Sequence, residues 1–321
     1  MTLAAAPVDA NKQAIRRLYD ETNSGNYDFL DELLAPDFVS YGGAGFKDLH
    51  GPAEFKELTM TFLTSFPDLW FQVDEIIGEG DDVLVSGTLS GTHKGDFYGM
   101  PATGNKVSWT GCAIFRFRGS QVIARWQEFD ALGLMAQIQP PAQGAGAPPP
   151  TAAHGKTGPA ARAAADSTGS QASSTSVEEN KAIFHRVIDE LWNQKKIDVA
   201  DELFAVDHES PSAPGLPAGP AGVKMIAGMF LAAFPDLKVD IEFEIAEGDM
   251  VGGRLRQKGT HSGPMASPTG EIPPSGKPVN FTEVAMLRIA DGKVVTSWYW
   301  TDMIGLLTQI GVIAAPPAAR G

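Results

Sequence analysis

Hydrophobic residues recur with helical spacing at the start of each half of the chain. In residues 9–24 and 177–193, apolar side chains return every third or fourth position, which predicts a helix with one apolar face. Shorter patterns of the same kind follow near residues 27–35 and 197–205. Each half therefore opens with two predicted helices.

A segment rich in Gly and Pro comes next in each half, at 38–52 and 208–220, and predicts irregular structure. A third helical pattern then runs to a Phe-Pro-Asp tripeptide at 66–68 and at 234–236, where the proline ends the helix. After the tripeptide, apolar and polar residues alternate through successive stretches separated by turn residues. This pattern predicts strands joined by hairpins.

Helices followed by a run of hairpin-linked strands are typical of an α+β domain. For each half we predict a curved antiparallel sheet covered on one face by about three N-terminal helices, with a short C-terminal helix after the last strand.

The last predicted strand and the helix after it occur twice with the same residues. Residues 125–138 read RWQEFDALGLMAQI and residues 297–310 read SWYWTDMIGLLTQI. Asp130 and Asp302 occupy matching places, each between the alternating pattern and the helical one. The chain therefore contains two copies of one domain.

The two copies define the expected domain boundaries. Domain 1 is predicted at 9–139 and domain 2 at 177–313, with tails at 1–8 and 314–321. Residues 140–176 are rich in Pro, Ala, Gly and Ser, which predicts a disordered linker. Such a tether keeps two similar domains at high effective concentration, so we expect them to pair as an intramolecular pseudo-dimer, with further homo-oligomers left open.

Composition narrows the class of protein. The net charge of −14 argues against partners held by many phosphate contacts, so neither nucleic acid nor an anionic membrane is expected. No signal peptide or membrane span is apparent, which favours a soluble, cytoplasmic protein. The single Cys112 excludes an internal disulfide framework. Neither a metal-ligand spacing nor a phosphate-binding loop was found, so no cofactor is predicted.

Three motifs recur in the same order in both halves: a Gly-Thr-His strand end, a Pro-x-x-Gly turn (PATG and PPSG) and an Asp-x-x-Gly-Leu-x-x-Gln end. The second half has four more residues between the first two motifs (172 − 168 = 4). With them, each half resembles a SnoaL-like polyketide cyclase domain of the nuclear-transport-factor-2-like fold. The resemblance implies a cone with an apolar interior pocket and an aspartate acting as acid and base, a role that carries over to Asp130 and Asp302. The histidine associated with the family's pocket falls on His93 and His261. The resemblance also implies pairing of the copies through their sheets.

The residues around Asp130 allow two interpretations. Strand alternation puts Trp126, Glu128 and Asp130 on one face. Burial beside an indole and a second carboxylate would raise the pKa of Asp130 toward a range useful for proton transfer. Alternatively, Asp130 and Asp302 are N-caps of the helices that follow them. The two interpretations are compatible.

The histidines also allow two interpretations. His93 is in register with Val83, Val85 and Leu89, so it should face their side of the sheet. His93 either contributes to a pocket or is satisfied by a hydrogen bond at a strand end. The same two interpretations apply to His261. Glu128 has no matching carboxylate in the second half, because Trp300 occupies the corresponding position. Chemistry is therefore assigned first to repeat 1, although a solvated strand-end carboxylate is the plainer interpretation of Glu128.

Large side chains could line a cavity for a flat hydrophobic ligand, with ordinary core packing as the alternative. The candidates in the first half are Tyr19, Tyr41, Phe66, Trp70, Phe97, Met100, Trp109 and Trp126, and those in the second half are His208, Trp298 and Trp300.

The function expected from the resemblance is that of a cofactor-independent polyketide (ester) cyclase in natural-product biosynthesis. An Asp would act as acid and base in intramolecular aldol-type ring closure of a small hydrophobic, polyketide-like substrate, which is lyase- or isomerase-type chemistry. An isomerase or hydrolase acting on a related natural product would use the same residues. A non-catalytic tandem domain that binds a small hydrophobic ligand is the further alternative.

Overall fold

The computed structural model describes residues 7–42, 47–139, 175–267 and 270–314. The chain divides into two compact units, one formed by Met1–Thr151 with Trp300–Gly321 and the other by Ala152–Tyr299. The predicted linker at 140–176 and the predicted tails lie almost wholly outside the described residues. Within the described ranges, no helix combines the length and apolar character needed to cross a membrane.

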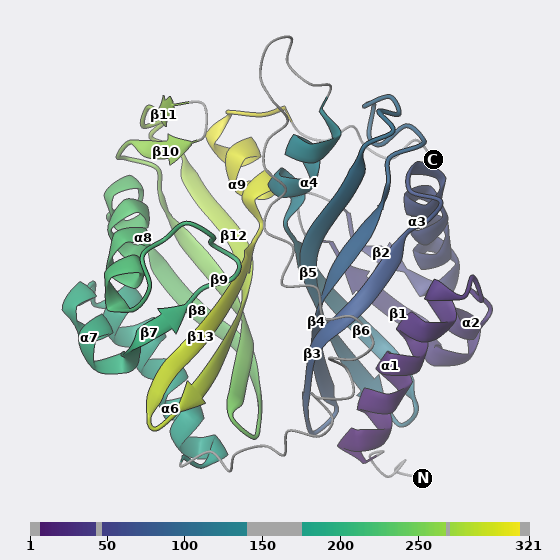
Figure 1. Ribbon diagram of the computed structural model, residues 1–321, viewed down its shortest axis with the longest axis horizontal. Helices are drawn as coiled ribbons and strands as arrows, with labels where there is room; N and C mark the ends of the chain where they lie inside the picture. The colour runs from purple at the N-terminus through teal and green to yellow at the C-terminus, as the bar shows by residue number, and fades with distance from the viewer. Residues whose placement is uncertain (1–6, 43–46, 140–174, 268–269, 315–321) are drawn as a thin grey trace. The chain divides into compact units, whose positions relative to one another are not determined.

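The first unit is a mixed sheet with helices on one face (Figure 1). Its strands are ordered β2-β1-β6-β5-β4-β3, and only the β1 and β6 pair runs parallel. The strand bounds are Leu34–Tyr41 for β1, Leu49–His50 for β2, Trp70–Glu79 for β3, Asp82–Thr92 for β4, Lys106–Arg118 for β5 and Gln121–Phe129 for β6.

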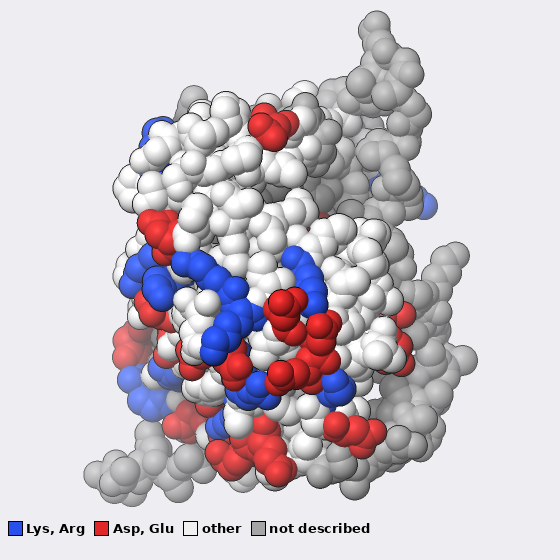
Figure 2. Space-filling view, turned by 90° about the vertical axis from the view of Figure 1, so that its left-hand side faces the viewer, with Lys and Arg blue, Asp and Glu red and all other residues white. Residues whose placement is uncertain are grey.

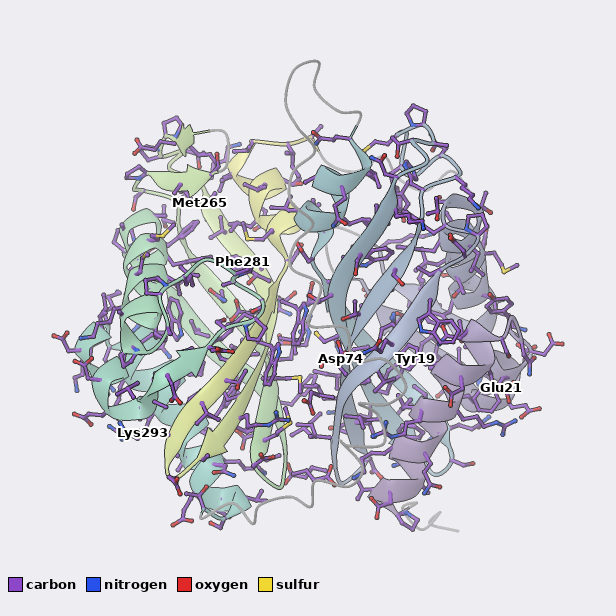
Figure 3. All side chains as sticks on the ribbon, in the orientation of Figure 1. Tyr19, Glu21, Asp74, Met265, Phe281 and Lys293 are labelled. Carbon is purple, nitrogen blue, oxygen red and sulfur yellow. The ribbon has the colours of Figure 1, made fainter. Side chains whose placement is uncertain are left out.

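The helices of this unit form where the apolar spacing predicts them. They are α1 (Val8–Asn23), α2 (Phe29–Leu33), α3 (Gly51–Ser65) and α4 (Ala131–Ile138), and α9 (Met303–Ile310) belongs to the same unit. Ile15 and Leu18 of α1 are buried in the core beside the sheet. Tyr19 extends from α1 toward the strands and stacks on Phe71 with ring centroids 3.8 Å apart, whereas Glu21 points outward (Figure 3).

The second unit repeats this order of elements. Its sheet is ordered β7-β13-β12-β9-β8, with a separate two-stranded sheet of β10 and β11. The strands are Phe204–Glu209 for β7, Lys238–Glu247 for β8, Met250–Thr260 for β9, Met265–Ser267 for β10, Gly270–Ile272 for β11, Pro278–Ala290 for β12 and Lys293–Thr301 for β13. The helices are α6 (Val177–Arg186), the π-helix η1 (Val187–Asn193), the 3-10 helix η2 (Ile197–Val199), α7 (Ala200–Leu203) and α8 (Pro220–Ala233).

Charged side chains of both signs alternate on the exposed surface of this unit. Figure 2 shows basic and acidic groups side by side on the face turned to the viewer. Lys224 pairs with Asp198 at 2.9 Å and with Asp201 at 2.7 Å, and Arg186 pairs with Glu190 at 2.6 Å. Because neighbouring charges cancel, this face carries no extended basic field of the kind that attracts nucleic acid.

The α+β prediction is confirmed, but one strand of each half was predicted as irregular. Residues 38–41 belong to β1 and residues 208–209 to β7. Each pairs in parallel with the last strand of its sheet, so one parallel pair accompanies the antiparallel pairs that the hairpin pattern predicted. These strands were predicted as irregular because parallel partners are far apart in sequence and leave no hairpin signal, while Gly and Pro dominate the local pattern.

An aspartate ties the end of the third helix to the end of a strand in both units. The carboxylate of Asp68, just after α3, accepts hydrogen bonds from the Thr92 amide and hydroxyl, each at 2.7 Å. Asp236 accepts the same bonds from Thr260 at 2.7 and 2.8 Å. We call each of these the Asp–Thr clamp. The conserved order of the Phe-Pro-Asp and Gly-Thr-His motifs in both halves thus has a structural cause.

Replacing Asp68 with Ala should lower the free energy of unfolding by about 1 kcal/mol at pH 7, because the clamp is exposed and its bonds are partly replaced by water. The hydroxyl of Thr92 is the main cause that holds the pKa of Asp68 below its usual range. A lowered folded-state pKa stabilises the protein above the unfolded value of 3.8, and this contribution disappears as pH falls through the folded pKa.

Chemical denaturation of wild type and variant at several pH values measures the effect. The difference should be largest at neutral pH and vanish in acid, while Ala in place of the exposed Asp207 should change little. A difference that persists unchanged in acid would contradict the role given to the charge.

Candidate functional site

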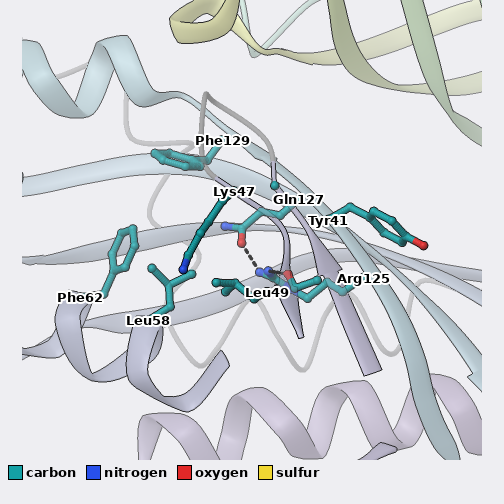
Figure 4. Close-up of a pocket in the computed structure, with 10 residues that line it drawn as sticks. Tyr41, Lys47, Leu49, Leu58, Phe62, Arg125, Gln127 and Phe129 are labelled. Carbon is teal, nitrogen blue, oxygen red and sulfur yellow. Dashed lines mark hydrogen bonds between the residues drawn. The ribbon is translucent and has the colours of Figure 1, made fainter. Parts of the chain in front are cut away.

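A pocket in the first unit opens between α3 and the neighbouring strands β1 and β6 (Figure 4). Its cavity volume is about 40 Å³, and the pocket is partly open to solvent. Sites that enclose a small molecule typically measure roughly 300–1,000 Å³, so this pocket does not enclose a ligand of that size. The lining residues are Ser40, Tyr41, Gly42, Lys47, Leu49, Leu58, Phe62, Arg125, Gln127 and Phe129.

Strand register decides which side chains of β6 face this pocket. Arg125 lies opposite Ser40 of β1 and opposite Phe115 of β5, and residues directly opposite each other point to the same face of a sheet. Phe115 belongs to the core with Val85, so Arg125 faces the helix-covered side. Alternation adds Gln127 and Phe129 to the same face.

The predicted partners of Asp130 on β6 lie on the other face. Trp126 is opposite Ile114, and Glu128 is opposite Cys112. Trp126 stacks on Tyr41 with centroids 5.1 Å apart, and the side chain of Tyr41 points away from the other labelled pocket residues in Figure 4. The structure therefore separates Trp126 and Glu128 from Arg125 and Gln127, and their predicted roles stay predictions.

Arg125 is the charged group at the centre of the pocket. Its residue surface is 9% exposed. Nη1 donates to the Ser40 hydroxyl at 3.3 Å, and Nη2 contacts the Gln127 side-chain oxygen closely. The guanidinium carbon lies 5.0 Å from the Phe55 ring centroid and 5.7 Å from that of Phe115. Burial lowers the pKa of Arg125, since desolvation disfavours the charged form.

Asp130 lies directly after the pocket residue Phe129 and caps α4. Its carboxylate accepts the Gly133 amide at 2.8 Å, and Asp302 accepts the Gly305 amide at 2.7 Å in the same way before α9. The capping interpretation is thus confirmed for both aspartates. Burial raises the pKa of Asp130 and outweighs the Gly133 hydrogen bond, which acts in the opposite direction.

Glycine leaves room for the carboxylate three residues after each of these aspartates. A Cβ added at Gly133 would lie 1.9 Å from Asp130 Oδ2, and one at Gly305 would lie 2.1 Å from Asp302 Oδ2. Any other residue at these positions would displace the carboxylate. The Gly of the repeated motif is therefore part of the geometry of the Asp.

His93 is completely buried and holds a turn. Its Nδ1 accepts the Thr103 amide at 3.4 Å and lies 3.1 Å from the Thr103 hydroxyl. Its ring lies 5.4 Å from that of Phe66, and burial lowers its pKa, which favours the neutral imidazole. Nδ1 thus makes the hydrogen bond at the strand end that one interpretation expected, whereas Nε2 is buried without a hydrogen-bond partner among the described residues. His93 is not among the pocket-lining residues.

His261 repeats this arrangement in the second unit. Its Nδ1 accepts the Ser275 amide at 3.2 Å, and burial lowers its pKa as well. Each histidine therefore anchors the turn of its own repeat. A chemical role for either remains a prediction.

The other predicted pocket residues are distributed between core and surface. Phe66, Phe97 and Trp109 are buried in one apolar cluster, against which Met100 packs. Tyr19 is partly buried at α1, and Trp70 is 54% exposed. Ordinary core packing therefore accounts for the buried members, and the structure does not bring Trp70 to the pocket.

The second unit lacks a cation where the first has Arg125. The repeated motif aligns Arg125 with Ser297. The Ser297 hydroxyl lies 2.8 Å from His208 Nε2, and burial lowers the pKa of His208 to about 4. The guanidinium carbon of Arg288 lies 5.7 Å from the Trp298 ring centroid. Trp300 donates its indole N–H to the Thr110 hydroxyl at 3.2 Å within the first unit.

Four pocket residues were not predicted from the sequence: Arg125, Gln127, Ser40 and Lys47. The repeated motif drew attention to Trp126, Glu128 and Asp130, although the intervening positions of β6 include an arginine whose chain neighbours are both apolar. Ser40 could be placed only through the parallel pairing of β1, which has no local signal. Across the described ranges, no cluster of His, Cys, Asp and Glu is arranged to hold a metal ion.

The raised pKa of Asp130 predicts a pH-dependent effect of replacing it with Asn, which still accepts a cap hydrogen bond. A folded-state pKa above the unfolded value of 3.8 stabilises the wild type at low pH, and this contribution is lost as pH rises through the folded pKa. Wild type should therefore lose stability relative to Asp130→Asn on going from pH 3 to pH 7. Denaturant unfolding at a series of pH values measures this, and a constant difference would contradict it.

Comparison with known proteins follows the same two-part division. The SnoaL-like polyketide cyclase family matches residues 13–138 and 182–310. The nogalonic acid methyl ester cyclase of Streptomyces nogalater is 28% identical over 123 residues, which are 37% of this chain and 89% of that protein.

Solved structures with the same likeness include two further bacterial proteins. A SnoaL-like protein of Jannaschia sp. CCS1 is 28% identical, with a TM-score of 0.40, over 43% of this chain and 97% of its own. IdmH of Streptomyces antibioticus is 28% identical, with a TM-score of 0.36, over 39% of this chain and 96% of its own. Because the family match covers both repeats and most of the sequence, the chain belongs to the SnoaL-like polyketide cyclase family, in two tandem copies.

Proposed function

We propose that this protein is a cofactor-independent cyclase of natural-product biosynthesis in which Asp130 transfers the proton during ring closure. The observation that carries the proposal is the partly buried Asp130 carboxylate, whose pKa is raised by that burial. Asp130 follows the pocket-lining Phe129 directly in sequence, although it is not itself among the lining residues. A carboxylate whose pKa moves toward the working pH is a better general base and, once protonated, a better general acid.

The proposed reaction is an intramolecular aldol-type closure. The Asp130 carboxylate removes a proton from a carbon that lies between two carbonyls of the substrate. The resulting enolate carbon bonds to another carbonyl carbon of the same molecule, and the π electrons of that carbonyl move to its oxygen. The protonated Asp130 then returns the proton to this oxygen. Holding both reacting carbons close together in the correct orientation supplies much of the acceleration.

A second candidate is a tandem domain that binds a small hydrophobic ligand without converting it. The capping bonds favour it, because they account for an Asp in both repeats without any chemistry. The two candidates differ in whether wild type turns the ligand over. Pairing of the two repeats as a pseudo-dimer is compatible with both and stays a prediction.

Asp130→Asn should reduce turnover by about 10²–10⁴-fold, since it removes the acid and base but keeps the cap. The first substrate to test is nogalonic acid methyl ester, taken from the name of the Streptomyces nogalater relative. Product formation and deuterium exchange at the acidic carbon can be followed by NMR in D2O. Asp302→Asn, the same change in the other repeat, is the matched control and should retain turnover. Full activity of Asp130→Asn would remove the proposal.

Gly133→Ala tests the position of the carboxylate while leaving the Asp in place. The new methyl group would push Asp130 from its observed position, and a displacement of about 1 Å can cost roughly 100-fold in rate. Alanine is the better helix former, which offsets part of the lost cap, so the variant should fold. Gly305→Ala is the control in the second repeat. Unchanged kcat in Gly133→Ala would show that the capped position of Asp130 is irrelevant to turnover.

A further inference from the structure

The guanidinium of Arg125 carries a buried positive charge that lacks an acidic partner. Other arginines of the same sheet are paired, Arg116 with Asp82 at 2.7 Å and Arg118 with Asp37 at 2.6 Å. Over the residues that the structure describes, Arg125 forms no ion pair, and its Nε is buried without a hydrogen-bond partner. A buried charge left in this state is unfavourable, because desolvation is not repaid by an opposite charge.

The groups around Arg125 hold it without neutralising it. Ser40 and Gln127 accept hydrogen bonds as neutral groups, and Phe55 and Phe115 offer only their ring faces. The Tyr19 phenol is close enough to interact electrostatically, but burial raises its pKa to about 12, so it is uncharged at neutral pH. The positive charge therefore remains available to a ligand.

The pocket next to Arg125 fits an anion attached to an apolar body. Lys47 adds an exposed second cation, and none of the lining residues is Asp or Glu. Leu49, Leu58, Phe62 and Phe129 supply the apolar part of the wall. An inorganic anion would leave this wall unused, whereas a neutral hydrocarbon would leave the guanidinium unpaired.

Arg125 has no cationic counterpart at the matching position of the second repeat. The corresponding position in the second unit is Ser297, hydrogen-bonded to a His208 whose pKa of about 4 leaves it neutral at physiological pH. Repetition of the fold therefore does not require Arg125, which removes a purely architectural explanation for the arginine. Its presence in one copy is better explained by a ligand of that copy.

We propose that the pocket of the first unit binds an aromatic carboxylic acid, with the carboxylate against Arg125 and the ring system against the apolar wall. Arginine and carboxylate form strong charge-assisted hydrogen bonds, and the low local dielectric around the buried Arg125 strengthens them. The inference rests on the proposed function only in taking the bound acid as the substrate. It differs from the substrate class in the relative's name, which is a methyl ester.

The test compares two probes of equal shape on the wild-type protein by isothermal titration calorimetry at pH 7. Benzoate should bind at least tenfold more tightly than benzamide, which lacks the charge. Arg125→Gln should remove this preference, and Arg125→Lys should keep part of it. Arg118→Gln, which removes an arginine that is already paired, is the matched control and should keep the preference.

Three results would overturn the inference. They are equal binding of acid and amide to wild type, binding of neither probe, and an acid preference that survives in folded Arg125→Gln. Inorganic phosphate that displaces the acid at comparable concentration would likewise show a general anion site without selection for the ring. The comparison on wild type holds even if the Arg125 variants fail to fold.

Asp130→Asn separates this inference from the proposed function. It should retain the full preference for the acid, because Asp130 is not among the groups assigned to the carboxylate. If Asp130→Asn turns substrate over normally while the preference persists, the cyclase mechanism fails and the acid site stands. If the preference is absent and Asp130→Asn is inactive, the acid site fails and the mechanism stands.

Discussion

The Asp–Thr clamp fixes the position of the third helix against the sheet, and the pocket wall depends on this position. The bonds from Thr92 to Asp68 fasten the end of β4 to the residues that follow α3. Next to them, the Ser65 carbonyl accepts the amides of Lys94 and Gly95, and Gly95 is required because a Cβ would lie 2.2 Å from the Thr64 carbonyl oxygen. With this end of α3 fixed against the sheet, its Leu58 and Phe62 become one wall of the pocket.

Much of this architecture could be predicted from sequence because its determinants are local. Helical spacing, the Phe-Pro-Asp stop and the alternation of the hairpin strands each act over a few residues, and the capping role of Asp130 followed from its place before a helix. The strand β1 could not be found in this way, since its partner β6 lies far along the chain. Without β1 there was no means of placing Ser40 opposite Arg125, so the polar centre of the pocket went unrecognised.

Strand β6 brings different chemistry to its two faces. Arg125 and Gln127 face the helices and the pocket, whereas Trp126 and Glu128 face the opposite side. A motif that appears compact in sequence is thus divided by the sheet. Asp130 belongs to neither face because it follows the last residue of the strand. Its orientation is set by the hydrogen bond from the Gly133 amide and not by the pleat of the sheet.

The contrast between Arg125 and Ser297 has a genetic meaning. In a homodimer encoded by one gene, the two subunits have the same sequence. A mutation that suits the site of one subunit is therefore also present in the other. When two copies are fused in a single reading frame, this constraint no longer applies. Each repeat can then change the polarity of its own residues by separate point mutations. The neutral His208 and Ser297 pair on one side and the cationic Arg125 on the other are the outcome expected of such independent drift or selection.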